Sequence, residues 1–514
     1  QRGLKGDKVD QLEQQANGDI HDSLVEHKKI DKLLSFYEKS QFEKALKFGL
    51  ALSQLYPLNP IILNVIGSVY HRLGNKEKAS SWFKNVAIIN PHTAESYNNI
   101  GTVKLQERCF EEAIINFIRS RRVDPYLVRA IVSLGLALVE EMRIDEAIDC
   151  YKDATNLKPD YAEPHNNLGV AFEKVGQLLE AKSCYCRAII LEPGYSDAYN
   201  NRGVLSHTFH DYEKAIVSYK RALTINPIHF SIHNNMASTY KVLGKYSEAL
   251  FHFDLADGAA AKSQSLECLY ALERYDEMES RLQVISDLDT SNIRVAAFSA
   301  FVSHQLKKAD PYPFCKNPLD FFHLSNLSDH AIDIDNFITN IINEAEDDNL
   351  VWEPDNKTTR LGYQTENTIF QAGKYCSLLE KIISNEIKSY YTEFASSDCL
   401  YMTSWPANYN LSGWFVRLIK DGHQEAHIHP DGWLSGVVYL KTLPTDSSEG
   451  AIELSLHGYD FPVIDNDYPR KIHHPNKGDI ILFPSSLFHR TIPFKTDTDR
   501  CVIAFDLVPT TQNR

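Results

Sequence analysis

The sequence predicts a multidomain chain in which an all-α solenoid of repeated helix pairs is followed by a double-stranded β-helix (jelly-roll) domain with flanking helices. Two observations predict this division. In the N-terminal half, proline, alanine and glycine recur with one shared period of 34 residues, which indicates a repeat array. Beyond residue 410 the pattern changes to short apolar runs separated by turn residues, which is typical of antiparallel sheets.

The repeats are defined by three residue types in one register. Prolines stand at 57, 91, 125, 159, 193 and 227, alanines at 45, 79, 113, 147, 181, 215 and 249, and glycines at 67, 101, 135, 169 and 203. Small residues let paired helices pack closely, and proline ends the second helix. The pattern, clear in Ala162–Gly169, resembles the tetratricopeptide repeat and covers about seven units from residue 27 to 263. A degenerate pair and a cap complete a solenoid over 27–308, preceded by a polar lead-in over 1–26.

Pairs of asparagines recur in one phase of these repeats. They are Asn98–Asn99, Asn166–Asn167, Asn200–Asn201 and Asn234–Asn235. The resemblance places them on the concave face, where Asn99, Asn167, Asn201 and Asn235 would bind the backbone of an extended peptide, as in the repeat arrays of peptide-modifying glycosyltransferases. Hydrogen bonds between repeats are the alternative, and both interpretations stay open.

The second domain begins where the period is lost, at residue 309, and runs to 514. Residues 330–345 and 375–395 have the apolar spacing of helices. Strands are predicted over 414–419, 436–440, 451–454, 479–483 and 501–507. Short strands separated by turns predict a jelly roll, whose mouth can hold a metal.

Three histidines of this domain are candidate metal ligands. His427 and His429 stand two apart on a predicted strand, so they point to the same side. His489 follows a later apolar run and completes a set of three ligands that leaves open positions, as a redox-active iron requires. Asp431 is the main alternative for one position, because His429-Pro430-Asp431 is a second His-x-Asp spacing.

Two further residues are candidate ligands of an anionic co-substrate. Arg500 follows the third histidine by eleven residues and begins a predicted strand, and a buried arginine binds a carboxylate through two parallel hydrogen bonds. Tyr439 lies on the strand after the histidine pair and is a candidate hydrogen-bond donor, although a core position would suit it equally.

These motifs carry a resemblance to a known family. The segments 414–417, 427–430, 432–440 and 500–507 resemble the C-terminal half of the Fe(II)/2-oxoglutarate-dependent oxygenases, in particular a group joined to tetratricopeptide arrays. The resemblance covers about residues 400–510 and implies Fe(II), 2-oxoglutarate as co-substrate and O2. It departs from the family at His429, since most members have a carboxylate at that position.

The resemblance implies a dioxygenase, in particular a hydroxylase, that acts on a protein or peptide recruited by the repeats. Two alternatives stay open. One is a non-catalytic repeat scaffold with a degenerate oxygenase domain, which the missing carboxylate at position 429 would explain. The other is a small-molecule oxygenase that uses its repeats for assembly.

Composition restricts the partners and the compartment. The formal net charge is −15 and no basic block occurs, so we expect neither nucleic acid nor an anionic membrane surface as a partner. No apolar run approaches the length of a membrane span. Nine scattered cysteines without a C-x-x-C pair are typical of reduced thiols in a cytoplasmic protein. Homo-oligomer formation, and a targeting segment before Gln1, stay open.

Overall fold

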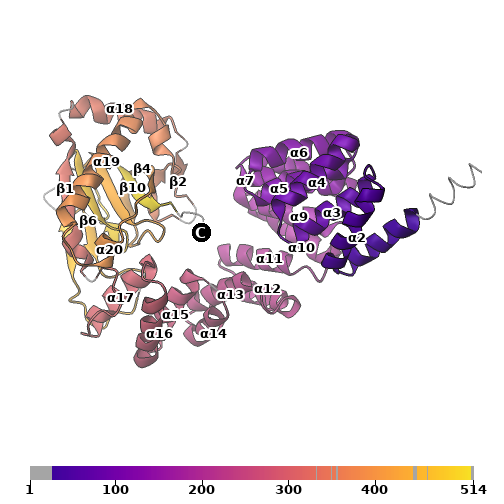
Figure 1. Ribbon diagram of the computed structural model, residues 1–514. Coiled ribbons are helices and arrows are strands. Elements are labelled where there is room, and N and C mark those ends of the chain that lie inside the picture. The colour runs from indigo at the N-terminus through magenta and orange to yellow at the C-terminus, as the bar shows by residue number, and fades with distance from the viewer. Residues whose placement is uncertain are drawn as a thin grey trace, which may run out of the picture. The chain divides into compact units, whose positions relative to one another are not determined.

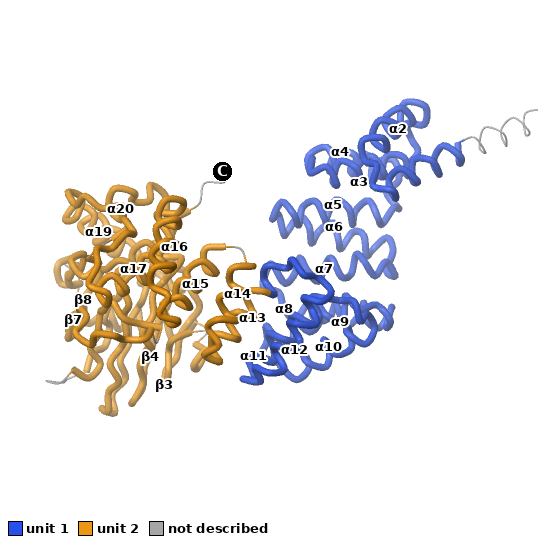
Figure 2. The backbone as a smooth tube through the Cα atoms, turned by 90° about the horizontal axis from the view of Figure 1, so that it is seen from below, with its two compact units in different colours: residues 1–232 blue, residues 233–514 orange. Residues whose placement is uncertain are grey.

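The computed structural model describes residues 26–510 except 257, 316, 331–332, 349, 355–356, 444–447 and 460. The predicted lead-in therefore lies outside the described residues, apart from its last position. The chain divides into two units, residues 1–232 and residues 233–514 (Figure 2). Each unit is described below by itself.

Antiparallel helix pairs form unit 1 and continue into the first part of unit 2 (Figure 1). Unit 1 contains α2 (Phe42–Leu55), α3 (Pro60–Arg72), α4 (Lys76–Ile89), α5 (Ala94–Gln106), α6 (Phe110–Val123), α7 (Val128–Glu140), α8 (Ile144–Leu157), α9 (Ala162–Lys174), α10 (Leu178–Leu191), α11 (Ser196–Thr208) and α12 (Tyr212–Ile225). Helix α13 (Phe230–Val242) spans the division, and α14 (Tyr246–Leu255), α15 (Ala259–Ala271), α16 (Tyr275–Leu288) and α17 (Ile293–Gln305) follow in unit 2. The predicted helical solenoid is confirmed.

The periodic small residues are the places where paired helices approach most closely. A Cβ atom added at Gly135 on α7 would lie 2.5 Å from the ring of Tyr151 on α8. The same relation holds between Gly203 and Tyr219, also at 2.5 Å. The periodic alanines from Ala45 to Ala249 are likewise fully buried. A larger side chain at these positions would force the two helices of a pair apart, which explains the shared period.

The second part of unit 2 consists of two antiparallel sheets with helices beside them (Figure 1). The larger sheet has the order β1-β8-β5-β10-β4-β3-β2, and the smaller has the order β7-β6-β9. The strands are β1 (His323–Asn326), β2 (Val351–Trp352), β3 (Thr359–Gln364), β4 (Tyr409–Gln424), β5 (Leu434–Lys441), β6 (Ile452–Ser455), β7 (Arg470–His473), β8 (Asp479–Pro484), β9 (Phe488–Thr491) and β10 (Arg500–Pro509). The helices are η1 (Pro318–Phe321), η2 (Leu327–His330), α18 (Ile334–Glu346), η3 (Ile369–Gln371), α19 (Lys374–Phe394) and α20 (Leu400–Thr403).

A row of apolar side chains across the larger sheet forms its core. Phe415 pairs with Ile503, Ile503 with Val438, and Val438 with Ile480, and all four residues are fully buried. Removal of these side chains from water is the main free-energy term that holds the four strands together. The predicted jelly-roll class is confirmed, and each predicted strand and helix overlaps one in the structure.

An ionic cluster joins the edge strand β1 to helix α19. His323 lies with Nε2 3.3 Å from Glu386 Oε2 and with Nδ1 2.5 Å from Glu393 Oε2. The hydrogen bond to Glu386 raises the pKa of His323, and the same bond lowers the pKa of Glu386. The charged forms of both groups therefore stabilise the folded state.

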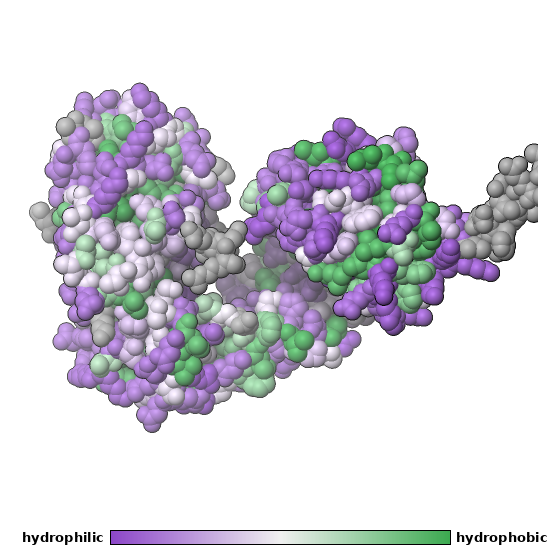
Figure 3. All heavy atoms as spheres, in the orientation of Figure 1, coloured by the Kyte–Doolittle hydropathy of each residue, from purple (hydrophilic) through white to green (hydrophobic). Residues whose placement is uncertain are grey.

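The surface of unit 1 exposes many large apolar side chains. Figure 3 shows hydrophobic residues gathered on part of this surface, and the first helix pairs contribute Leu55, Leu58 and Ile88, each more than 60% exposed. Within the described part of the chain, no helix combines the length and apolar character needed to cross a bilayer.

Candidate metal centre

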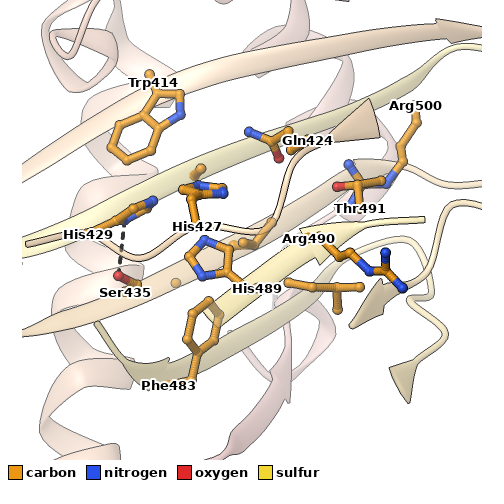
Figure 4. Close-up of a pocket in the computed structure, with 14 residues that line it drawn as sticks. Trp414, Gln424, His427, His429, Ser435, Phe483, His489, Arg490, Thr491 and Arg500 are labelled. Carbon is orange, nitrogen blue, oxygen red and sulfur yellow. Dashed lines mark hydrogen bonds between the residues drawn. The ribbon is translucent and has the colours of Figure 1, made fainter. Parts of the chain in front are cut away.

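The three predicted histidines come together at one point between the two sheets. The ligand nitrogens of His427, His429 and His489 all lie within 4.8 Å of one another, and Figure 4 shows the three rings gathered side by side. Among the described residues, no other group of three or more His, Cys, Asp or Glu side chains is as close. The structure therefore contains a cup of three nitrogen ligands.

The backbone holds two of these residues in register. His427 N donates to His489 O at 3.1 Å and His489 N donates to His427 O at 3.0 Å, which forms an antiparallel bridge between the segments. The sequence predicts His427 and His429 on a strand, but β4 ends at Gln424. The segment after it turns away to pair with β9, and Pro430 could not donate to a continued ladder.

In each of the three histidines, Nδ1 lies within hydrogen-bonding distance of an oxygen acceptor. His427 Nδ1 lies 2.7 Å from Glu425 O, and His489 Nδ1 lies 3.2 Å from Leu487 O. His429 Nδ1 lies 2.5 Å from Asp506 Oδ1. Each Nδ1 faces an acceptor and so carries the proton, which leaves the lone pair on Nε2 for a metal.

Burial keeps two of the imidazoles neutral. It lowers the pKa of His427 to about 3, and it lowers the pKa of His489 well below its usual value, with neighbouring histidines adding to both effects. Neutral imidazole is the form that binds a metal. His427 and His489 can therefore bind a cation at neutral pH without first losing protons.

Asp506 on β10 is a site residue that the sequence analysis did not identify. Its Oδ1 accepts from His429 and also from the Ser435 hydroxyl at 2.7 Å, and Ser435 lies 2.8 Å from Ser485. The carboxylate is 9% exposed. A buried carboxylate behind a histidine fixes the ring and increases its basicity. Its one sequence signal is an acidic residue inside the apolar run 501–507.

Asp431, the alternative ligand, lies outside the histidine cup. Its side chain is exposed, and it does not belong to the group of close ligand atoms. It lines a wider cleft in front of His427 and His429. The structure thus groups His429, and not Asp431, with the other two histidines.

A small cavity of about 10 Å³ lies between the histidine cup and Arg500. Its walls include the three histidines, Trp414, Gln424, Thr491 and Arg500, and in Figure 4 Gln424 and Thr491 lie between the rings and the guanidinium. Arg500 is 2% exposed, and its Nε donates to Gly450 O at 3.1 Å. Its Nη1 is buried and has no hydrogen-bond partner among the described residues. An anion in this cavity would satisfy that group.

Tyr439 lies beside Arg500 and not on the cavity wall. The guanidinium carbon is 5.1 Å from the centre of its ring, and the buried hydroxyl has no hydrogen-bond partner within the described part of the chain. Burial raises the pKa of Tyr439 to about 12, so the hydroxyl keeps its proton. The residue can position the guanidinium through the ring, or donate to a ligand that reaches it.

The asparagine pairs form bonds between successive repeats. Asn99 Nδ2 donates to Asn64 Oδ1 at 3.1 Å, and Asn201 Nδ2 donates to Asn166 Oδ1 at 3.0 Å. The four candidate residues are half-buried: Asn99, Asn167, Asn201 and Asn235. These bonds favour the repeat-to-repeat alternative for Asn99 and Asn201. Binding of a peptide by the amides stays a prediction.

Comparison with known families assigns both parts of the chain. Residues 412–506 match the family described as "Putative 2OG-Fe(II) oxygenase". Residues 61–93, 135–176, 162–195 and 196–229 match tetratricopeptide-repeat families. The chain joins tetratricopeptide repeats to an oxygenase-type domain. The match to this oxygenase domain includes the histidine triad, Arg500 and Asp506.

Solved structures of repeat proteins resemble part of the chain. The structure of Pseudomonas aeruginosa PilF is 21% identical in sequence, covers 40% of this chain and 97% of its own, and has a TM-score of 0.37. YrrB, described as a TPR protein with an unusual peptide-binding site, is 21% identical over 36% of this chain and 95% of its own, with a TM-score of 0.30. A TPR protein of Thermus thermophilus is 20% identical over 35% and 98%, with a TM-score of 0.32. No curated protein matches the chain significantly.

The oxygenase domain fits the metal and the co-substrate in the family's name. Three histidine nitrogens within 4.8 Å of one another suit a first-row divalent metal. The buried, unpartnered Nη1 of Arg500 in the same cavity suits the distal carboxylate of 2-oxoglutarate. The residues that would hold the metal are therefore His427, His429 and His489, and Arg500 would hold the co-substrate.

Proposed function

We propose that the chain is an Fe(II)- and 2-oxoglutarate-dependent dioxygenase, a hydroxylase that acts on a protein or peptide recruited by the repeats. The observation that carries the proposal is one cavity with two ends. Three histidine nitrogens form one end, and an arginine whose buried Nη1 has no partner among the described residues forms the other. A dicarboxylic keto acid has the matching chemistry, since one end chelates a metal and the other accepts from a guanidinium.

The residues of the domain have separate tasks. His427, His429 and His489 bind the metal, and Asp506 holds His429 in the tautomer that exposes Nε2. Arg500 orients the co-substrate. Bound Fe(II), with 2-oxoglutarate and O2, would supply oxidation of an unactivated C–H bond, with release of succinate and CO2. The buried walls of the cavity exclude water from the reacting atoms.

Asp506 also weakens the argument for a degenerate, non-catalytic domain. That argument rests on the loss of a carboxylate at position 429. In this chain a carboxylate lies directly behind the histidine that replaces it, at 2.5 Å. The negative charge lies behind the His429 ring and not at the usual ligand position, and it would still act on a bound metal through that ring.

Two features support recruitment of a protein by the repeats. The first helix of several repeats carries a half-buried asparagine at the equivalent position. Unit 1 also exposes large apolar side chains, which are typical of interaction surfaces. Asn167 is the sharpest probe, because its Oδ1 accepts a hydrogen bond from its neighbour Asn166 within the same repeat. Asn167→Ala should lower oxidation of a protein substrate and leave turnover of 2-oxoglutarate alone unchanged. Equal oxidation of the protein substrate by the wild type and by Asn167→Ala would favour the small-molecule alternative.

Co-substrate binding tests the proposed oxygenase activity. The full chain is loaded with Fe(II) without oxygen and titrated with 2-oxoglutarate, while heat and visible absorption are recorded. One metal and one 2-oxoglutarate per chain are expected, with an absorption band that needs both. Metal binding without any effect of 2-oxoglutarate would refute the proposal.

A further inference from the structure

A second cleft opens on the outer side of the histidine cup. It has a volume of about 460 Å³ and shares Trp414, Gln424, His427 and His429 with the inner cavity. The inner cavity ends at buried Arg500, whereas the outer cleft is wider and includes the exposed Asp431. If the co-substrate binds between the triad and Arg500, the outer cleft is the space that remains for the molecule to be oxidised.

One wall of this cleft comes from the last helix of the repeats. Arg294, on α17, lines the cleft together with residues of the oxygenase domain. The helix is firmly attached to that domain: Gln305 accepts from Ile464 N and Asp465 N, each at 2.8 Å. The rings of Phe298 and Phe301 also pack on Phe461, at centroid distances of 5.4 Å. Buried contacts of this kind hold α17 in a fixed position within unit 2.

Arg294 reaches the metal centre through one aromatic ring. Its guanidinium carbon lies 5.3 Å from the centre of the Tyr459 ring. The Tyr459 hydroxyl takes a hydrogen bond from the backbone of Ile428, the residue between the two metal-binding histidines His427 and His429. Tyr459 therefore contacts both this cation and the backbone between the two histidines.

A second cation lies in the segment just before strand β3. Lys357 lines the same cleft, and its neighbour Thr358 lies with Oγ1 3.5 Å from His427 Nε2. Arg294 and Lys357 thus come from segments far apart in the sequence and meet at one opening.

These two cations differ from three arginines of the domain that have acidic partners. Arg360 pairs with Glu425, Arg417 with Asp499, and Arg490 with Glu453. Arg294 and Lys357 are half-buried, and neither forms an ion pair with any described residue. Of the two acidic residues that line the cleft, Asp506 is bonded to His429 and Asp431 is exposed. Cations that are partly withdrawn from water without a counter-charge favour binding of an anion.

We infer that Arg294 and Lys357 select the substrate: the outer cleft binds a peptide with an acidic side chain beside the carbon that is oxidised. That the bound peptide is a substrate rests on the proposed function. That the cleft binds an anion rests on the residues of the cleft alone. Arg294 supplies a planar fork for the carboxylate, and Lys357 supplies a second charge. The repeats therefore contribute a specificity residue to the cleft itself.

Two short peptide libraries test the inference with the full chain. They have random sequences around one fixed central residue, Glu in one library and Gln in the other. Retention on immobilised protein without added iron is measured, so the result does not depend on turnover. The wild type should retain the Glu library about tenfold better. The overall charge of −15 opposes this preference, so general attraction cannot produce it.

Variants locate the preference in the cleft. Arg294→Gln and, separately, Lys357→Gln should bring the ratio towards one, and Arg294→Glu should favour a third library with central Lys. Lys308→Gln, which changes an exposed cation paired with Glu279 just after the same helix, should leave the ratio unchanged. Equal retention of the Glu and Gln libraries by the wild type, or an unchanged ratio in both Gln variants of the cleft, would overturn the inference.

Turnover separates this inference from the proposed function. A Glu preference that depends on Arg294, in a protein that never converts 2-oxoglutarate, would refute the oxygenase and leave the anion site. Conversion of 2-oxoglutarate without any Glu preference would refute only the substrate class.

Discussion

Replacement of Asp506 by asparagine should weaken metal binding although Asp506 is not itself a ligand. Asp506→Asn keeps the size of the side chain and one acceptor oxygen, but it removes the negative charge 2.5 Å from His429 Nδ1. The carboxylate is 9% exposed, so water screens it little.

The size of the effect follows from this position. Loss of a carboxylate behind a metal-binding histidine typically weakens the metal by about 10–100-fold, which is about 1.4–2.7 kcal/mol. The Ser435 hydroxyl adds a second bond to the same oxygen, at 2.7 Å. Ser435→Ala removes that neutral bond and keeps the charge, so it should have the smaller effect.

The assay is an oxygen-free competition titration of Fe(II) against a chelator of known affinity. Asp499→Asn is the matched control, because it removes a carboxylate of the same domain that pairs with Arg417 and does not contact the triad. Unfolding temperatures exclude a general loss of structure. If Asp506→Asn bound Fe(II) as tightly as Asp499→Asn, the role given to the buried carboxylate would be wrong.

Three further predictions concern the co-substrate, the ionic cluster and the repeats. Arg500→Ala should weaken 2-oxoglutarate binding by about 2–5 kcal/mol in calorimetry and leave metal binding largely intact. Glu386→Gln should destabilise unit 2 by about 1–3 kcal/mol, most strongly between pH 4.5 and 6.5. Because the pKa of Glu386 is lowered in the folded state, its carboxylate stabilises the fold above pH 4.5. Because the pKa of His323 is raised, its contribution is complete below pH 6.5 and is lost as the pH rises through the folded value. Melting temperatures across pH should show this window, and a loss independent of pH would contradict it. Gly135→Ala should cost about 1–3 kcal/mol through overlap with the facing ring, whereas Gly194→Ala, with open space around it, should be neutral in the same denaturation assay.

The local patterns of the sequence predicted the fold well, because they reflect contacts between near neighbours. The 34-residue period arises where Gly135 meets Tyr151 within one helix pair, so it repeats in the sequence. The strands β4, β5, β8 and β10 are buried apolar runs and were predicted. The short strand β2 and the exposed, polar strand β7 lack such a run, and they were missed.

The candidate site was predictable only where its residues form a motif. The spacing of the three histidines and Arg500 matches a known motif, so the sequence predicted them. Asp506 and Arg294 act through contacts across the fold, to His429 and to Tyr459. No short-range pattern encodes such contacts, and only the packed structure places Asp506 behind His429 and Arg294 on the wall of the outer cleft.

The most direct test of the account is formation of succinate from 2-oxoglutarate by the full chain with Fe(II) and O2. The wild type should release several equivalents of succinate per chain, and His489→Ala should release none above the level of free Fe(II), since it removes one of three converging ligands. A wild type that holds Fe(II) at the triad and forms no succinate, or a His489→Ala variant that forms as much as the wild type, would contradict the central claim.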